Sequence, residues 1–424
     1  MANQVKKVSP GPSGAKSLLI PITNIYDGND YSAQILIGSK DVPANVILDT
    51  GSSTIAVTPK VYKAASDRNL KPTTLAQLVT YGTGGWAGPV VNTTLTIGSG
   101  SQQIILDNSP IAITDIQQKN NFSGVDGIMG LGYNGLNTAF DFKAYLAKTA
   151  PKSPFTFPWP FSSGSFKTFA TKFVNLIRSE KVPEIEFDPY FTELEKKGVT
   201  ANKFAFYTRR SWVHYATTNA GQVAKDPLNN GFFVLGGGEE QTELYSGNFI
   251  DVDVVHDLYY NTNLVAVQVE GGERIAAQPL QSQYVPFMVS NSIIDSGTSA
   301  LVLADDVYKA IGDSFQKLNP TFNHQITLAA QDGIAMIDLY LSKWPKINFI
   351  FTGINGGNEV TLTCDPHTYW QVNFPAPGKA VYQIAPLGQE PNQSIFGLPF
   401  MNNYYTVFDR STDANGIIRF APIK

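Results

Sequence analysis

Two short stretches carry residue types that could do acid–base chemistry, one in each half of the chain. "NVILDTGSSTIAV" runs from Asn45 to Val57, and "NSIIDSGTSALVL" runs from Asn291 to Leu303. In each, an apolar run leads to an Asp (Asp49 and Asp295), which is followed by a hydroxyl residue, a Gly and another hydroxyl residue. One such stretch alone is typical of a tight surface turn. Two copies with apolar residues on both sides indicate a repeated, buried loop.

The chemistry that this repeat could support follows from placing two carboxyls together. We expect two matching lobes to bring Asp49 and Asp295 within a few ångströms, where the two cannot both ionise readily. One carboxyl then keeps a proton while the other loses it. Such a pair can hold a water molecule, because the ionised member can remove its proton while the protonated member polarises a carbonyl group. This chemistry predicts neither a metal ion nor a cofactor.

The elements that must position these residues are predicted to be mostly β-strands. Aromatic residues make up 12% of the chain, and 36 Gly and 26 Pro separate many short runs rich in Val, Ile, Thr and Tyr. This composition is typical of strands joined by turns. Helical spacing is confined to a few segments, among them "FDFKAYLAK", "FATKFVNLIRSEK" and "YFTELEKKG" between residues 139 and 200, and "ADDVYKAIGDSFQKL" after the second motif.

A second repeated feature indicates two similarly organised halves. Downstream of each Asp motif, two apolar residues and a Gly recur, in "GIMGLG" and in "SIFGLP". We therefore predict a flexible N-terminal arm over residues 1–17, an N-terminal lobe over 18–243 with an insertion near 140–190, and a C-terminal lobe over 244–424. A chain of 424 residues is also long enough that two lobes are expected from its length alone.

Composition narrows the classes of function and the compartment. The formal net charge is −4, which argues against nucleic acid as a partner. No stretch approaches the roughly 18 apolar residues of a membrane span, and the first residues lack the apolar core of a signal peptide. One cysteine, Cys364, excludes a disulfide within the chain. These observations predict a cytoplasmic protein that does not bind membranes. Because one chain carries both Asp loops, we also expect the protein to be a monomer.

Beyond the two motifs, several stretches make the chain resemble the pepsin-like aspartic proteases. "VTYGTGGWAG" is similar to the flap hairpin of that family, "VDGIMGLGY" to the segment after the flap, and "YYTVFDR" to the C-terminal strand. The resemblance covers about residues 18 to 424, with 140–190 as the main unmatched insertion. It implies a mostly β, bilobal acid-protease fold of two related β-barrel lobes with a few short helices. It also implies an endopeptidase acting on peptides or unfolded proteins and binding pepstatin-type inhibitors.

The resemblance assigns roles to individual residues at the matching positions. It makes Asp49 and Asp295 the catalytic pair, and it places Tyr81 in the flap as a lid over the substrate. The residues that support the pair would be Thr50, Gly51, Ser52, Ser296, Gly297 and Thr298, of which Thr50 and Ser296 would brace the two loops against each other. The flap tip would be Gly82 and Thr83. Substrate contacts would come from Ile47, Val125, Ile128, Ile293, Ser299 and Ile395, and they predict a preference for hydrophobic residues at the scissile bond.

Departures from the family pattern are also visible. Ala56 stands where relatives usually have a Trp that hydrogen-bonds the flap tyrosine, so Trp86 is either a substitute tether or ordinary packing. The chain also lacks the disulfides and the long inhibitory pro-segment of secreted relatives, and in this it resembles the minimal bacterial members. The Thr298 position is similar to that of acid-working members, whereas the predicted compartment is near neutral. A pepsin-like protein without catalysis, acting as a binding or inhibitor protein, is the alternative function.

Two further signals have mainly structural interpretations. "FTFPWPF", from Phe155 to Phe161, either packs on the lobe or forms a partner-binding loop, and we expect packing because Pro-rich aromatic insertions commonly cover a core. Cys364 and His367 have the spacing of a metal pair, but the chain has only four His and no matching second pair. We therefore predict no metal site there.

Overall fold

The structure is a computed structural model that describes residues 17–81, 84–100, 102–118, 122, 124–161, 164–354, 357–412 and 415–424. Its contacts divide the chain into two compact units. Ser32–Lys197 form the N-terminal unit, and Gly198–Lys424 together with Met1–Tyr31 form the C-terminal unit. Strands predominate in both, so the mostly β prediction is confirmed. The predicted N-terminal arm lies almost entirely outside the described residues.

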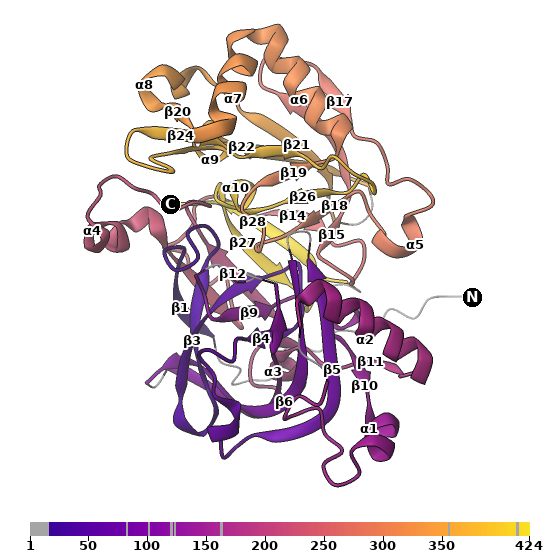
Figure 1. Ribbon diagram of the computed structural model, residues 1–424. Helices are drawn as coiled ribbons and strands as arrows, with labels where there is room; N and C mark the ends of the chain where they lie inside the picture. Colours follow the sequence, from indigo (N-terminus) through magenta and orange to yellow (C-terminus); the bar gives the residue numbers. More distant parts are fainter. Residues whose placement is uncertain are drawn as a thin grey trace. The chain divides into compact units, whose positions relative to one another are not determined.

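One sheet organises the N-terminal unit, drawn from indigo to magenta in Figure 1. Its order is β11–β10–β5–β6–β7–β4–β9–β3–β2, and β2 also pairs with β6, so that the β2-to-β6 part closes on itself. The strands are β2 (Ser32–Ile37), β3 (Val42–Asp49), β4 (Ile55–Val57), β5 (Lys71–Tyr81), β6 (Gly84–Ser99), β7 (Gln102–Ile113), β8 (Ile116–Gln117), β9 (Gly127–Gly130), β10 (Thr138–Asp141) and β11 (Glu184–Glu186). The last four residues of β3 are all buried, as expected for a strand covered on both faces.

Several sheets make up the C-terminal unit. An antiparallel sheet has the order β1 (Leu18–Thr23), β13 (Asn230–Leu235), β12 (Lys203–Tyr207), β27 (Tyr404–Asp409), β28 (Ile417–Pro422) and β14 (Ile250–Asp253). The sheet that carries the second motif has the order β15 (Asn261–Thr262), β18 (Ser292–Ile294), β26 (Ser394–Phe396), β19 (Leu301–Leu303) and β25 (Ile384–Pro386). Two others have the orders β17 (Arg274–Ala276), β16 (Leu264–Val269), β21 (Ile347–Thr352), β22 (Glu359–Cys364), and β20 (Ile334–Ala335), β24 (Lys379–Tyr382), β23 (Trp370–Val372).

Strand pairing explains where the division between the units falls. β12 pairs with β27 near the C-terminus of the chain, and β13 pairs with β1 near its beginning. These pairings group β12 and β13, which precede residue 243, with the C-terminal unit. The sequence-based boundary between residues 243 and 244 stays a prediction.

Each segment that is predicted to be helical from its spacing contains a helix. The segments near 140–200 contain α1 (Lys143–Thr149), α2 (Phe166–Glu180) and α3 (Tyr190–Lys196), and α6 (Asp305–Leu318) follows the second motif. "FDF" before α1 is wrong as a helical start, because Thr138–Asp141 pairs as β10 and the Asp141 carboxylate accepts the N–H of Lys143 at 3.0 Å. Other helices are α4 (Ala220–Lys225), α5 (Val285–Met288), α7 (Thr321–Asp332), α8 (Met336–Leu339), α9 (Pro366–Tyr369) and α10 (Leu398–Met401).

The aromatic insertion packs as predicted. Trp159 and Phe161 lie against a core cluster of the N-terminal unit that includes Phe142, Phe169 and Phe173. The ring centroids of Phe142 and Phe161 are 4.7 Å apart, and those of Trp159 and Phe161 are 4.9 Å apart. The sequence "FTFPWPF" therefore covers the core, although Phe155 at its start remains 38% exposed.

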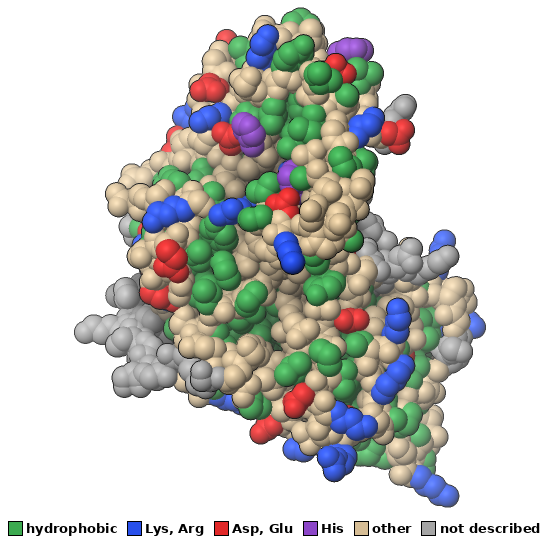
Figure 2. Space-filling model, turned by 90° about the vertical axis from the view of Figure 1, so that its left-hand side faces the viewer, with side chains coloured by type: hydrophobic (Ala, Val, Ile, Leu, Met, Phe, Trp, Pro, Cys, Tyr) green, Lys and Arg blue, Asp and Glu red, His purple; other side chains and the backbone are tan. Residues whose placement is uncertain are grey.

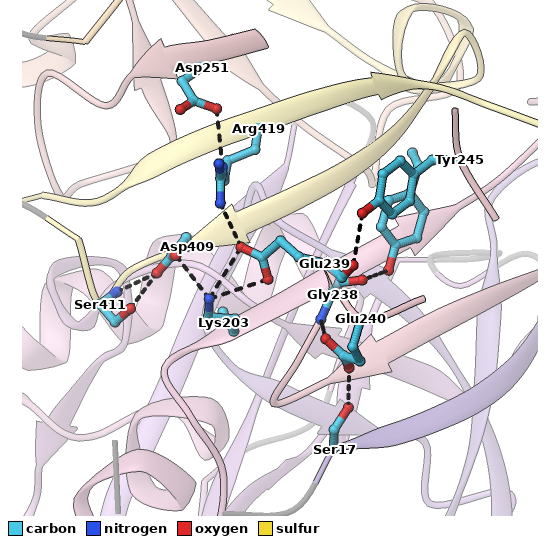
Figure 3. Close-up of polar contacts among 11 residues, drawn as sticks. Ser17, Lys203, Gly238, Glu239, Glu240, Tyr245, Asp251, Asp409, Ser411 and Arg419 are labelled. Carbon is cyan, nitrogen blue, oxygen red and sulfur yellow. Dashed lines mark hydrogen bonds and ion pairs between the residues drawn. The ribbon is translucent and has the colours of Figure 1, made fainter. Parts of the chain in front are cut away.

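A charged network joins the strands of the antiparallel sheet in the C-terminal unit (Figure 3). Lys203 and Asp409 are cross-strand partners with Nζ and Oδ2 3.1 Å apart, and Arg419 bonds Asp251 across the next strand pair at 3.1 Å. Glu239 contacts both cations, at 3.3 Å and 2.8 Å. Although burial opposes ionisation, the Ser411 hydroxyl and the charge of Lys203 lower the pKa of Asp409. The network thus keeps opposite charges paired in a half-buried place.

On the face that Figure 2 draws, acidic and basic side chains are both spread among hydrophobic and uncharged ones. In the part of the chain that the structure describes, no helix is both long and apolar enough to span a membrane.

The carboxylate of Asp67 joins the loop before β5 to neighbouring segments of the N-terminal unit, and we call this group of hydrogen bonds the Asp67 staple. Asp67 accepts hydrogen bonds from the hydroxyls of Tyr62 and Thr93 at 2.6 and 2.5 Å and from the N–H of Ser39 at 2.8 Å. A side chain at Gly38, whose φ is 73°, would collide with this carboxylate. Burial opposes ionisation, but the donated hydrogen bonds outweigh it and lower the pKa of Asp67 to about 2.

The first prediction concerns this staple. Because the folded-state pKa of Asp67 lies below its ordinary value, its stabilisation is present above pH 4 and is lost as the pH falls toward 2. We expect Asp67→Asn to lower the free energy of unfolding by about 1 kcal/mol at pH 7, a figure reduced for the partial exposure of the group, and by less at pH 2.5. Urea denaturation at the two pH values measures this. Asp107→Asn, at an exposed carboxylate, is the control, and an equal loss at both pH values contradicts the assignment.

Candidate active site

The backbone around Asp49 is fixed by a parallel strand pair in the N-terminal unit. Asp49 is the last residue of β3 and lies opposite Gly130, the last residue of β9. The N–H of Leu131 donates to the Asp49 carbonyl at 2.7 Å, which extends the pairing beyond both strands. The side chain is 7% exposed, so it lies at the edge of the core and not on an open surface.

Two donors from its own loop orient the Asp49 carboxyl. Oδ1 accepts the N–H of Gly51 at 2.8 Å, and Oδ2 accepts the hydroxyl of Ser52 at 2.5 Å. The two carboxyl oxygens therefore each have a defined partner, which fixes the plane of the group. This arrangement is the one that the sequence predicts for Ser52.

A glycine and a buried network of polar side chains hold the Asp49 loop against the rest of the N-terminal unit. A Cβ at Gly130 would lie 2.4 Å from the backbone nitrogen of Ser53, so only Gly permits the approach of the two segments. The Ser53 hydroxyl donates to the Tyr133 carbonyl at 2.7 Å, and the Thr54 hydroxyl donates to Asn137 at 2.8 Å. Gln77 from β5 donates to the Thr54 hydroxyl at 3.0 Å. Sequence reasoning missed Gln77, a polar residue within the β5 strand, and Asn137, which lies in the turn before β10.

The second motif repeats this local geometry in the C-terminal unit. Asp295 follows β18, which runs parallel to β26, and its N–H donates to the Phe396 carbonyl at 3.0 Å. Oδ1 of Asp295 accepts the N–H of Gly297 at 2.9 Å, and Oδ2 accepts the Thr298 hydroxyl at 2.6 Å. The side chain is 9% exposed. Each Asp is thus held by an N–H two residues later and a hydroxyl three residues later.

The match between the halves extends beyond the Asp residues. The N–H of Asp126 donates to the Asn45 carbonyl at 2.9 Å, and the N–H of Ser394 donates to the Asn291 carbonyl at 2.8 Å. Gly397 occupies the place that Gly130 has in the first half, since a Cβ there would lie 2.1 Å from the Thr298 carbonyl oxygen. The repeated sequence therefore folds into a repeated structure.

Neighbouring hydroxyl residues occupy equivalent positions as well. Thr50 and Ser296 are both buried next to their Asp residues, and the brace between the two loops stays a prediction. Ser299, predicted to contact substrate, is half-buried, and its hydroxyl accepts a hydrogen bond from Asn29 at 2.9 Å. Asn29 comes from the loop after β1, and sequence reasoning did not identify it.

The apolar residues predicted to line substrate pockets fall into two groups. Ile47, Val125 and Ile128 belong to one hydrophobic cluster of the N-terminal unit, which we call the inner cluster and which also contains Ala56, Trp86, Ala112 and Phe122. Ile293 and Ile395 are register partners on β18 and β26 in the C-terminal unit. These residues are therefore grouped within each unit, and their contact with substrate stays a prediction.

The predicted flap corresponds to the hairpin of β5 and β6. Tyr81 ends β5 and pairs with Gly84 at the start of β6, while Gly82 and Thr83 lie outside the described residues. Trp86 is fully buried in the inner cluster together with Ala56, so its ring contributes to the packing of the N-terminal unit. A role for Trp86 in tethering the flap tyrosine stays a prediction.

No metal centre emerges among the described residues, where no group of three or more His, Cys, Asp or Glu side chains could hold an ion. Cys364 is fully buried, and burial raises the pKa of its thiol to about 12. His367 is exposed and its Nδ1 lies 2.8 Å from Asp365. Cys364 is therefore part of the core, whereas His367 contacts Asp365 at the surface.

The second prediction tests the close approach of β26 to the second loop. Gly397→Ala would place a methyl carbon 2.1 Å from the Thr298 oxygen and 2.3 Å from the Ala300 oxygen. We expect it to lower the free energy of unfolding by more than about 2 kcal/mol, because backbone atoms must move. Gly312→Ala in α6 meets open space and is expected to stabilise by roughly 0.5–1 kcal/mol. Thermal denaturation measures both, and similar melting temperatures for the two variants would refute this packing.

Comparison with known proteins agrees with the repeated motif. The family model described as "Eukaryotic aspartyl protease" matches residues 30–148 and 220–422. The protein named "Beta-secretase" from Strongylocentrotus purpuratus is 22% identical over 415 residues, which is 92% of this chain. The chain spans 66% of that relative's length. The family match covers most of the chain and both Asp motifs, and the chain therefore belongs to the pepsin-like aspartyl protease family.

Proposed function

We propose that the protein is an aspartic endopeptidase in which Asp49 and Asp295 act as one acid–base pair. The observation that carries this proposal is that the two carboxyls accept the same pair of hydrogen bonds. Each accepts one from a backbone N–H and one from a hydroxyl of its own loop. A carboxyl that served only as a turn cap would not need the same support twice. Membership of the family favours the same activity.

The proposed reaction balances with one water molecule and one shared proton. The ionised carboxyl removes a proton from the water while the oxygen of that water attacks the peptide carbonyl carbon. The protonated carboxyl gives its proton to the carbonyl oxygen, and the result is a neutral tetrahedral diol. When the C–N bond breaks, the carboxyl that gained a proton transfers it to the leaving nitrogen, and a hydroxyl proton returns to the other carboxyl. Ser52 and Thr298 keep both carboxyl planes fixed throughout.

The proposed substrate is an extended peptide segment of a protein. Tyr81 would close over it and exclude water, and the backbone groups and hydroxyls near Gly51, Gly297 and Ser299 would bond its main chain. The apolar groups around Ile47 and Ile293 would favour hydrophobic side chains on both sides of the scissile bond. We also propose that the protein works as a cytoplasmic monomer.

A catalytically inactive binding or inhibitor protein is the competing proposal. It predicts peptide binding without cleavage. The intact pair of Asp loops, with every supporting hydroxyl present, favours the enzyme.

The third prediction separates these two functions. We expect Asp49→Ala, Asp295→Ala and the double variant each to lower kcat for a peptide by at least about 10³-fold, because acid–base catalysis by the pair is lost. The double variant should be no worse than the single ones, since the two residues act as a unit. Cleavage is measured from pH 3 to 7 with and without pepstatin.

Asp67→Asn serves as the matched control, because it alters a structural carboxylate and should retain activity. Unchanged cleavage in either Asp variant of the pair would refute the mechanism. Peptide binding without cleavage by the unmodified protein would establish the inactive alternative. Mass spectrometry of the fragments from a denatured protein reads the residues beside each cut, and charged residues on both sides would contradict the hydrophobic preference.

The fourth prediction concerns the hydroxyls that hold the carboxyls. A hydroxyl that donates to a carboxyl oxygen holds the plane of the carboxyl, so its removal lets the group turn away from the orientation that the reaction needs. We expect Ser52→Ala and Thr298→Val each to lower kcat/KM about tenfold. Ser53→Ala is the control, because the Ser53 hydroxyl bonds the Tyr133 carbonyl and not the Asp49 carboxyl. An equal kcat/KM in all three variants would exclude the assigned role.

A further inference from the structure

The flap hairpin is packed on both of its faces within the N-terminal unit. Successive side chains of a strand point to opposite faces, and the register pairs Val79 with Trp86 and Leu78 with Ala87. Val79 and Trp86 lie on the inner cluster. Leu78 and Ala87 lie in a second cluster, which we call the outer cluster and which includes Phe142, Phe169 and Phe173. The hairpin is therefore held between two hydrophobic clusters.

Helix α2, from the 140–190 insertion, supplies much of the outer cluster and lies beside β6 and β8. Phe169 and Phe173 are 3% and 2% exposed, and their ring centroids are 5.1 Å apart. Phe173 also lies 5.2 Å from both Phe142 and Phe161. The helix begins with a Ser165 cap and ends at Lys181 in the left-handed conformation. It is thus a well-anchored element, and Figure 1 draws it alongside the strands of the hairpin.

One contact brings α2 close to the end of the hairpin. A Cβ at Gly85 would lie 2.3 Å from Cζ and 2.7 Å from Cε1 of Phe166, so the Phe166 ring rests directly on the Gly85 backbone. Gly85 pairs with Thr80, one step before the pair of Tyr81 and Gly84 that ends the described part of the hairpin. The Gly85 carbonyl also accepts the N–H of Gln118 at 2.9 Å. Gly85 is therefore held both by a ring and by a hydrogen bond.

The helix lies outside the part of the chain that the family model matches, because the match omits residues 149–219. The family match therefore does not account for its contact with the hairpin. Because Gly85 has no side chain, the Phe166 ring can contact its backbone directly. A Cβ at position 85 would also lie only 2.5 Å from the Val79 carbonyl oxygen. Gly85 and Phe166 fit each other as a pair.

We propose that α2 is a buttress for the flap and that Phe166 is a positioning residue that acts through Gly85 on Tyr81. With the inner cluster on one face and the Phe166 ring on the other, the hairpin end keeps the position from which Tyr81 covers a peptide. Without the ring, the hairpin can bend away from the inner cluster. The catalytic part of this inference rests on the proposed function, whereas the mechanical part does not.

The fifth prediction uses hydrogen exchange together with kinetics. In Phe166→Ala we expect the backbone amides of residues 78–81 and 84–87 to exchange about tenfold faster or more, because the hairpin end opens more often. We expect KM for a peptide to rise about fivefold to tenfold, because part of the substrate's binding free energy is then used to order the flap. We expect kcat to change less than about twofold, because the flap is ordered once the substrate is bound. Phe166→Leu, which restores part of the contact, should give intermediate values for both.

Leu176→Ala is the matched control, because Leu176 lies on the same helix and packs on the same cluster but occupies the opposite end of α2 from Phe166. It should lower thermal stability without changing exchange in the hairpin or KM. Unchanged exchange in Phe166→Ala, or the same acceleration in Leu176→Ala, would overturn the inference. Exchange needs no catalysis, so this readout decides the buttress even if the unmodified protein cleaves no peptide.

Discussion

The site depends on one constraint, which is that each Asp loop turns back so that its own N–H and hydroxyl meet the two carboxyl oxygens. Asp49 meets Gly51 and Ser52 in this way, and Asp295 meets Gly297 and Thr298. A turn this tight at the edge of a core leaves backbone groups that need partners. The neighbouring strands β9 and β26 supply them, and a glycine at the end of each permits the close approach. The conformation of each loop is therefore inseparable from the strand beside it.

The buried network behind the first loop shows why that loop remains fixed. Thr54, Gln77 and Asn137 bond one another, and Asn137 also donates to the Phe187 carbonyl at 3.0 Å. Buried polar groups of this kind are costly unless they are satisfied, so they favour one arrangement over its alternatives. Because Gln77 belongs to β5, the same network connects the Asp49 loop to a strand of the flap hairpin. The Asp49 loop and the flap hairpin therefore share one buried hydrogen-bond network.

Sequence reasoning could find the elements whose signals are local. The two Asp motifs, the amphipathic spacing of α2 and α6 and the turn-rich strands each depend on neighbouring residues, and the structure contains them at the expected places. It could not find Asn29 beside Ser299 or Gln77 beside Thr54, because those partners are brought together only by folding. α7 was missed for another reason, since its segment "TFNHQITLAAQD" mixes polar and apolar residues without a clear stripe. The recurrence of two apolar residues and a Gly downstream of each Asp motif was also visible in the sequence, because a repeat is a long-range signal that needs no folding to be seen.

The flap shows how an insertion can serve a site without contributing a reacting group. β10 pairs with β5 as far as Ala76, and β8 pairs with β6 from Trp86 onward, so the described end of the hairpin is a two-stranded ribbon. Such a ribbon is at best marginally stable in water, and glycines at positions 84 and 85 weaken it further. Strand pairing alone would therefore leave its end mobile. Trp86 fills the inner cluster beside the small Ala56, and Phe166 covers the opposite face at Gly85. Both contacts lie within two residues of the last described pair of the hairpin, so side-chain packing reaches the end of the hairpin on both faces.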